Sequence, residues 1–160
     1  MPSQPLPYRP RTLTPIARVP GLDYDVLDQL LGYSLRRAQV AMFLAFHEAT
    51  RGLDVTPPRF TALVIVGANA GISQSDLGKV LGIARSGAML LTDRLEGRGL
   101  VERRRRPNDG RAWGLQLTRR GERFVGRIKD KVVRLDLMKS KKLTAAERRE
   151  LLRLLEKLAR

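Results

Sequence analysis

Apolar residues recur every three or four positions along most of this chain, which is the spacing of amphipathic helices. From Asp23 to about Arg51 the repeat includes Leu27, Leu31 and Leu35, and it predicts one long helix. Such a helix, about 40 Å long at 1.5 Å per residue, is too long for so small a domain to cover alone. We therefore expect a second subunit to cover part of its apolar stripe.

Two shorter helices are expected after the first. Thr56 precedes two prolines, which favours a helix from Pro57 to about Asn69. Ser73 and Asp76 have the S-x-x-D spacing of a capping pair, so a short third helix is expected to begin there. This helix is expected to end at a tight turn around Gly82.

The segment ARSGAMLLTDRLEGRG follows this turn and predicts a fourth helix with two distinct faces. Ala84, Ala88, Leu91 and Leu95 fall on one face at about 100° per residue. The opposite, solvent-directed face carries Arg85, Ser86, Met89, Thr92 and Glu96. Two short helices joined by a glycine-containing turn, the second with a polar outer face, are typical of a helix-turn-helix motif that binds DNA.

Two segments with strand-like composition, LVERRRR and AWGLQLT, flank the sequence PNDG at 107–110. Proline fixes φ, asparagine and aspartate tolerate the left-handed region, and glycine accepts a positive φ, so this sequence favours a turn. The chain is therefore expected to form a β-hairpin whose tip and one arm are rich in arginine. Because alternate strand residues point in opposite directions, about two of the four arginines at 103–106 are expected to face DNA.

Two leucine-rich helices are expected after the hairpin. Phe124, Ile128 and Leu135 lie on one stripe of the first helix. Thr144 and Glu147 form a T-x-x-E capping box at the start of the second. The predicted fold is therefore mainly α: a winged helix-turn-helix with a two-stranded β-wing, and an α-helical dimerisation layer formed by the N- and C-terminal helices.

The expected domain organisation follows from these elements. Residues 1–20 are expected to form a flexible arm rich in proline and arginine, and residues 21–55 an N-terminal dimerisation helix. Residues 56–118 are expected to form the DNA-binding domain, and residues 119–160 the C-terminal dimerisation helices. Two interpretations of the arm stay open: an untethered tail, or a basic segment that touches DNA or a partner subunit.

The charge of the chain indicates the kind of partner. It has 31 Lys and Arg residues against 16 Asp and Glu, a formal net charge of +15. Such an excess favours nucleic acid first, an anionic membrane surface second and an acidic protein third. The absence of cysteine and the presence of one histidine, His47, exclude thiol chemistry and a His-rich metal site. We expect no catalytic activity, no cofactor and no metal, and a cytoplasmic protein without membrane contact, since no apolar run approaches the length of a membrane span.

Four segments resemble motifs of the MarR family of bacterial transcription regulators. They are VTPPRF, SQSDLGKVLG, TDRLEGRGLVERR and RPNDGRAWGLQLTRRG, and the last two carry most of the resemblance. Arg59 replaces a glutamine that is usual in the family, and Met89 and Leu90 stand where a threonine and a basic residue are frequent, so the half-site preference stays open. The resemblance implies a homodimeric repressor whose two reading heads face one pseudo-palindromic operator, about 34 Å apart.

The resemblance also assigns residues to double-stranded DNA. Arg111 stands at the position of the family's wing arginine and is expected to enter the minor groove, with Asp109 as an orienting partner. Arg85 is expected to contact a guanine or a phosphate, and Met89 a thymine methyl group. The full set expected to bind DNA is Ser73, Gln74, Ser75, Arg85, Ser86, Met89, Thr92, Arg103, Arg105, Arg106, Asp109 and Arg111.

The resemblance further implies an effector, a small aromatic acid or an aromatic acyl-coenzyme A (acyl-CoA) thioester, that releases the repressor from DNA. The segment LGYSLRRAQ places a tyrosine beside two cations, which suits an anionic ligand. The candidate ligand-binding residues are Tyr33, Arg36, Arg37, His47 and Phe60. A solvated arginine pair and a hydrogen-bonded histidine are the alternative interpretation. The competing function is a ligand-independent architectural or nucleic-acid-coating basic protein, which would bind with little sequence preference and a steep salt dependence.

Overall fold

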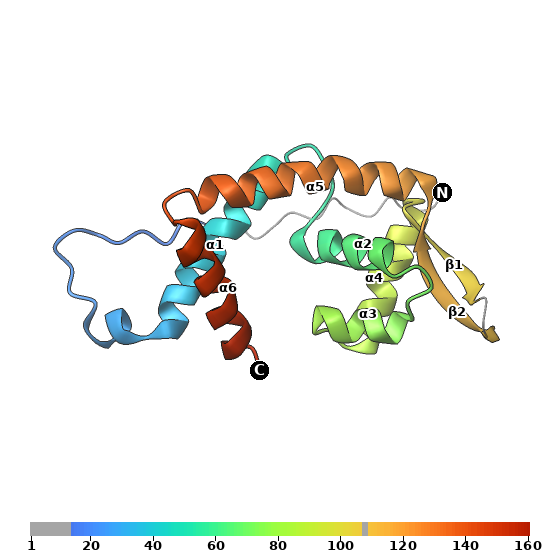
Figure 1. Ribbon diagram of the computed structural model, residues 1–160, viewed down its shortest axis with the longest axis horizontal. Helices are drawn as coiled ribbons and strands as arrows, with labels where there is room; N and C mark the ends of the chain where they lie inside the picture. The colour runs from blue at the N-terminus through green and yellow to red at the C-terminus, as the bar shows by residue number, and fades with distance from the viewer. Residues whose placement is uncertain (1–13, 107–108) are drawn as a thin grey trace, which may run out of the picture. The chain divides into compact units, whose positions relative to one another are not determined.

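The computed structural model describes residues 14–106 and 109–160, and the side chains of residues 106 and 109–112 lie outside its description. Two compact units divide the chain between Glu48 and Ala49. Figure 1 shows the helices and strands of both units in chain order. Within the described part of the chain, no helix is long and apolar enough to cross a membrane.

The first unit contains a 3₁₀ helix, η1 (Asp25–Gln29), and an α-helix, α1 (Leu31–Ala49). The prediction of a single helix from Asp23 to Arg51 is therefore wrong at its start. Leu30 has an extended backbone, with φ −89° and ψ 118°, and it separates the two elements.

Polar contacts within this segment explain the break. The Asp23 carboxylate accepts a hydrogen bond from the backbone N–H of Asp25 at 2.8 Å, and such local bonds compete with helix formation. Arg18 donates two hydrogen bonds to the Asp28 carboxylate, at 2.6 and 2.7 Å. The hydrogen bonds from Arg18 hold the pKa of the Asp28 carboxyl below its ordinary value. The segment before α1 is therefore held in a local fold of its own.

The second unit is a winged helix-turn-helix followed by two helices, which confirms the predicted mainly α fold. Its elements are α2 (Pro57–Ala68), α3 (Gln74–Leu81), α4 (Arg85–Gly97), β1 (Val101–Arg106), β2 (Asp109–Leu117), α5 (Arg119–Lys139) and α6 (Ala145–Leu158). The Ser73 cap of α3 and the capping box of Thr144 and Glu147 at α6 are both confirmed.

The core of the second unit lies where α2, α3, α4 and α5 meet the base of the hairpin. Its most buried side chains include Leu63, Leu77, Leu95 and Ile128, each at most 1% exposed. Burying a leucine or isoleucine contributes about 1.5–3 kcal/mol relative to leaving it exposed. The apolar stripe predicted for α5 is confirmed, and α2 packs on both α3 and α5 (Figure 1).

The hairpin is anchored to the connection between α2 and α3. β1 pairs antiparallel with β2. Leu115 in β2 also accepts a hydrogen bond from the N–H of Gly71 at 2.8 Å and donates one to the carbonyl of Ile72 at 2.9 Å. A Cβ on Gly114 would lie 2.5 Å from the Gly71 carbonyl oxygen, so this position requires glycine. The base of the wing is therefore fixed on the helical core.

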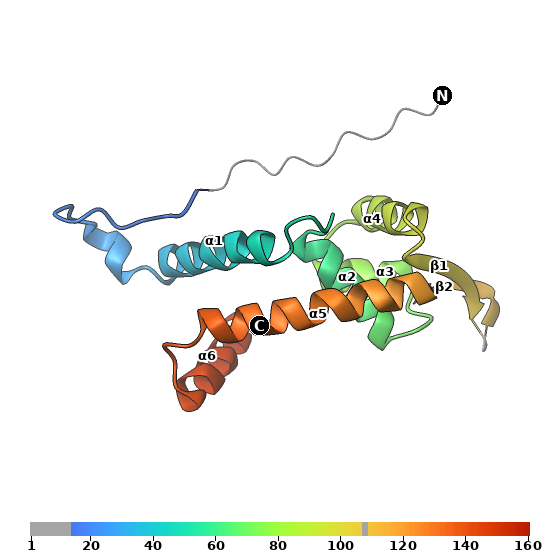
Figure 2. The same ribbon diagram turned by 90° about the horizontal axis from the view of Figure 1, so that it is seen from above.

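The start of α5 is fixed to the same base, and Figure 2 shows α5 beginning where β2 ends. Thr118 caps α5: its hydroxyl accepts a hydrogen bond from the N–H of Gly121 at 3.0 Å and donates one to the Gly99 carbonyl at 2.6 Å. A Cβ on Gly121 would lie 2.0 Å from the Leu100 carbonyl oxygen. The close approach of α5 to the wing therefore depends on a glycine.

Candidate nucleic-acid interface

A left-handed glycine sets the turn between α3 and α4. Gly82 has φ 62°, a conformation that glycine adopts without steric cost, and its N–H bonds to the carbonyls of Gly78 and Lys79. The N–H of Ile83 donates to the Gly78 carbonyl at 3.1 Å. The turn therefore satisfies the end of α3 and leads directly into α4.

The start of α4 has the features of a phosphate site. Its N-cap residue, Ala84, provides no side-chain acceptor for the first N–H groups of the helix. The helix dipole adds partial positive charge at this end. Ser75, Lys79 and Arg85 help to line a hollow of about 310 Å³ beside it. Lys79 is paired with Asp76 at 3.1 Å, so the uncapped amides, the dipole and Arg85 are the groups that favour an anion at this position.

The outer face of α4 carries three of the predicted residues. Arg85, Ser86 and Met89 are exposed, Met89 to 54%. The prediction that Thr92 shares this face is wrong, because Thr92 is only 1% exposed. Its hydroxyl donates to the Ala88 carbonyl at 2.8 Å, so the side chain is buried with its polar group satisfied. Arg85, Ser86 and Met89 therefore remain as the candidates on α4.

At the start of α3, the three predicted residues differ in availability. The Ser73 hydroxyl accepts the N–H of Asp76 at 3.0 Å and donates to its carboxylate at 2.6 Å, so it is engaged in the helix cap. Gln74 is half-buried and Ser75 is exposed. A phosphate contact by these residues stays a prediction.

Arg103 connects the hairpin to α4. Its guanidinium donates to the carboxylate of Asp93 at 2.6 Å and also to that of Glu96. The Arg103 side chain is 29% exposed. Both carboxylates belong to α4, so this arginine fixes the hairpin relative to that helix. A direct contact of Arg103 with DNA stays a prediction.

The next two arginines of β1, Arg104 and Arg105, are more exposed than Arg103. The Arg104 guanidinium pairs with the Glu102 carboxylate at 3.0 Å. The Arg105 guanidinium lies 5.6 Å from the ring centroid of Trp113, which is 57% exposed. Arg105 therefore stands on an exposed part of the wing, where a phosphate can reach it.

The far end of the hairpin carries the remaining predicted residues, Arg106, Asp109 and Arg111. Their backbone lies in the two strands, and Arg106 is opposite Asp109. Their side chains lie outside the described residues, and so does the turn at 107–108. Their contacts with DNA stay predictions.

Comparison with known proteins gives an identity that agrees with this geometry. The sequence model of the MarR family matches residues 53–112. A transcriptional regulatory protein for the hcr operon of Thauera aromatica is 37% identical over 131 residues, which cover 81% of this chain and 79% of the relative. The chain belongs to the MarR family.

Two solved structures of the transcriptional repressor CouR match this MarR-family chain. CouR bound to a 23-mer DNA duplex is 36% identical, with a TM-score of 0.80 over 87% of this chain and 99% of that one. CouR bound to p-coumaroyl-CoA is 35% identical, with a TM-score of 0.76 over 87% of this chain and 98% of that one. The chain is a transcriptional repressor of the MarR type with a winged-helix fold.

The effector residues predicted for this MarR-family repressor lie in both units. Tyr33, Arg36 and Arg37 share one face of α1, and the Arg37 guanidinium lies 5.8 Å from the Tyr33 ring centroid. Within the described residues, the Nε of Arg37 and the Nε2 of His47 are buried without a hydrogen-bond partner. Phe60 is on α2, in the second unit. A shared ligand site for the five residues stays a prediction.

Asp54, which no sequence motif marks, connects three parts of the second unit. Its carboxylate pairs with Arg59 of α2 at 2.8 Å and with Arg98 after α4 at 3.4 Å. The Arg98 guanidinium also lies 5.4 Å from the Phe124 ring centroid. Arg59, which replaces the glutamine usual in MarR-family proteins, is 12% exposed and is therefore placed by this ion pair. A carboxylate five residues before an arginine was too weak a signal to reveal it.

Proposed function

We propose that this MarR-family repressor binds a pseudo-palindromic operator as a homodimer. A small aromatic acid or an aromatic acyl-CoA thioester then releases it. The observation that carries the proposal is the start of α4, where the first amides have no side-chain cap and Arg85 is exposed, on a helix whose other end is bonded to the arginine-rich hairpin through Arg103. Amides and guanidinium groups position a protein on phosphates, and the exposed residues that follow can read base edges.

Dimerisation is supported by an apolar face that one chain leaves exposed. On α6, the leucines at steps of three and four are Leu151, Leu154, Leu155 and Leu158, and all are exposed. A second subunit that supplies the same face would bury them, as expected for a two-fold symmetric interface. Two reading heads related by a two-fold axis require an operator with the same symmetry.

The effector is supported by chemistry on α1 and by one similar protein. The guanidinium of Arg37 and the imidazole of His47 each hold a buried nitrogen without a partner among the described residues. A ligand that accepts or donates a hydrogen bond there would satisfy these groups. CouR, at 35% identity, has been solved with p-coumaroyl-CoA, a thioester of an aromatic acid.

Operator binding is tested by measuring the affinity of the protein for a pseudo-palindromic DNA fragment from beside its own coding region. The same fragment with a shuffled sequence is measured alongside. We expect selective binding at about 150 mM salt, where weak non-specific contacts are largely screened. Equal affinity for both fragments would contradict the proposal and favour the architectural, nucleic-acid-coating function.

Two variants locate the contacts. Arg85→Ala and Arg111→Ala should each weaken binding to the operator by about 1–3 kcal/mol. Lys141→Ala, in the exposed connection between α5 and α6, removes the same charge away from the interface and serves as control. Equal losses in all three variants would mean that charge alone determines binding.

The effector is tested with a panel of aromatic acids and their coenzyme A thioesters in the operator-binding assay. We expect at least one member to release wild-type protein, and Arg37→Gln to reduce its potency. Failure of the whole panel, while the operator still binds selectively, would reject this ligand class and leave the repressor assignment intact.

A further inference from the structure

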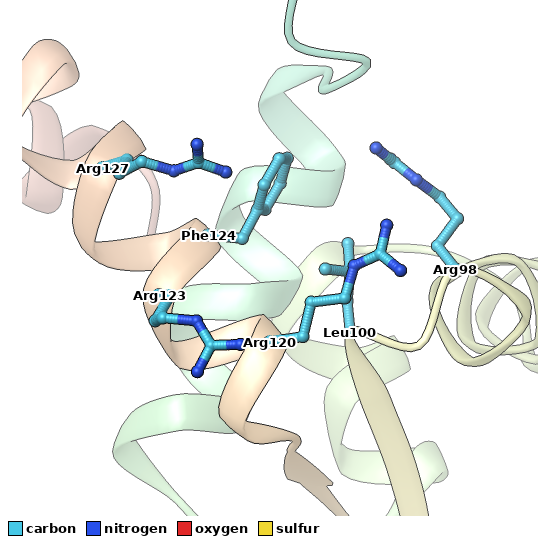
Figure 3. A pocket seen from close by; sticks show the side chains of 6 residues that line it. All are labelled: Arg98, Leu100, Arg120, Arg123, Phe124 and Arg127. Carbon is cyan, nitrogen blue, oxygen red and sulfur yellow. The ribbon is translucent and has the colours of Figure 1, made fainter.

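A pocket rich in arginine lies on α5 and beside the end of α4, apart from the start of α4. Its volume is about 530 Å³, within the usual range for small-molecule sites. Figure 3 shows the ring of Phe124 between the side chains of Arg98 and Arg127. The residues that line the pocket are Arg98, Leu100, Arg120, Arg123, Phe124 and Arg127.

Three of the four arginines repeat along one face of α5. Arg120, Arg123 and Arg127 are three and four residues apart, a spacing at which like charges repel. Among the residues whose side chains the structure describes, no carboxylate pairs with any of the three. Arg98, by contrast, is paired with Asp54. The pocket therefore concentrates positive charge that the fold itself does not neutralise.

The floor of the pocket has a different chemistry from its rim. Phe124 is 9% exposed and Leu100 is 2% exposed, so the floor is apolar. The planar guanidinium groups above it match phosphate oxygens in pairs. A ligand that fits both surfaces carries several negative charges on phosphates and a flat or apolar group beside them.

We propose that this pocket binds a soluble organic diphosphate of the nucleotide type, with its phosphates on the arginines and its base against Phe124. The DNA backbone offers the same phosphate chemistry. A pocket of this volume admits a small molecule, whereas a duplex would touch only its rim. In addition, the pocket shares no lining residue with the hollow at the start of α4.

The test is calorimetric titration of the full chain with ADP. The double variant Arg123→Gln/Arg127→Gln removes two exposed cations and keeps residues that favour a helix. We expect wild-type protein to bind ADP and this variant to bind it at least about tenfold more weakly. The control Lys129→Gln/Lys141→Gln removes the same charge outside the pocket and should retain wild-type affinity.

Further measurements distinguish a soluble nucleotide from the DNA backbone as the source of the phosphate. Adenosine should not bind, and pyrophosphate should bind more weakly than ADP, because each lacks one half of the expected contacts. Operator affinity should be the same in the arginine variant and the lysine control. The proposal is overturned if wild-type protein does not bind ADP, or if both double variants lose ADP affinity equally. It is also overturned if the arginine variant loses only operator affinity, because that result would assign these arginines to DNA. None of these outcomes depends on release by an aromatic ligand.

Discussion

At the scale of single residues, Arg103 shows that a basic residue in an arginine-rich hairpin can stabilise the fold. Its position among four consecutive arginines favours a phosphate contact, yet its guanidinium binds Asp93 and Glu96 of α4. The neighbouring Arg104 is more exposed and pairs only with Glu102 within the described residues. Two arginines adjacent in the sequence therefore differ in structural role.

Replacing Arg103 with glutamine should destabilise the protein by about 1 kcal/mol, the upper end for exposed pairs, because two carboxylates lose their partner. Arg104→Gln is the matched control and should change the free energy of unfolding by less than about 0.5 kcal/mol. Urea denaturation measures both. Equal effects would show that Arg103 does not fix the hairpin to α4.

At the scale of elements, the sequence predicts the helices whose starts are marked by short-range capping signals. The caps at Ser73 and Thr144 are short-range signals, and the helices that follow them are found where expected. The break at Leu30 was missed because it depends on bonds such as that of Arg18 with Asp28, ten residues apart. The burial of Thr92 was missed because its hydroxyl suggests exposure, although Thr92 lies one turn after the buried Ala88 and its hydroxyl bonds to the Ala88 carbonyl.

The candidate site was predictable to the same extent. The exposed residues of α4 follow from helical periodicity, and the hairpin follows from its turn sequence. The ion pairs of Arg103 and Asp54 depend on how separate elements pack, and no local spacing encodes that.

The junction of the wing with α5 gives a prediction for a pair of glycines in one helix. Gly121→Ala should destabilise the protein by at least about 2 kcal/mol, because its Cβ would overlap the Leu100 carbonyl. Gly126→Ala has no atom within 4 Å of its Cβ and should stabilise by about 0.5–1 kcal/mol through helix propensity. Thermal unfolding compares the two. Similar melting temperatures would contradict the close approach.

The start of α6 gives a prediction about pH. Hydrogen bonds from the backbone N–H and hydroxyl of Thr144 lower the pKa of the Glu147 carboxyl below its ordinary 4.5. Because the folded pKa is lowered, this stabilisation is complete above pH 4.5 and is lost as the pH falls through the folded value. Thr144→Ala should therefore raise the titration midpoint of Glu147, measured by carbon-detected NMR. Glu150, whose pKa Arg153 lowers, is the internal control and should not move.

At the scale of the whole molecule, a single chain leaves the apolar face of α6 exposed to solvent. Leu151 and Leu155 are 45% and 37% exposed, and Leu154 and Leu158 lie on the same face. An apolar face of this kind on a soluble protein usually marks an interface. The proposed dimer would cover it and would also place two reading heads on one operator.

Leu151→Asp/Leu155→Asp should shift the protein from dimer to monomer in analytical ultracentrifugation, because two carboxylates would be buried at the interface. The affinity of this variant for the operator should fall as the dimer dissociates. Arg149→Asp/Lys157→Asp introduces the same residues outside the leucine face of α6 and should remain dimeric. Monomeric wild-type protein, or dissociation of both variants, would contradict the interface.

The uncapped start of α4 connects DNA binding to the stability of the reading head. Because Ala84 offers no acceptor, water must solvate the first amides of α4 in the free protein. An operator phosphate would then act as the missing cap, so that the repressor melts at a higher temperature on its operator than alone. A serine at position 84 would cap the helix permanently, and the free protein would gain stability while the DNA-bound state lost part of its advantage. The residue at position 84 would thereby set how much of the stability of α4 depends on bound DNA.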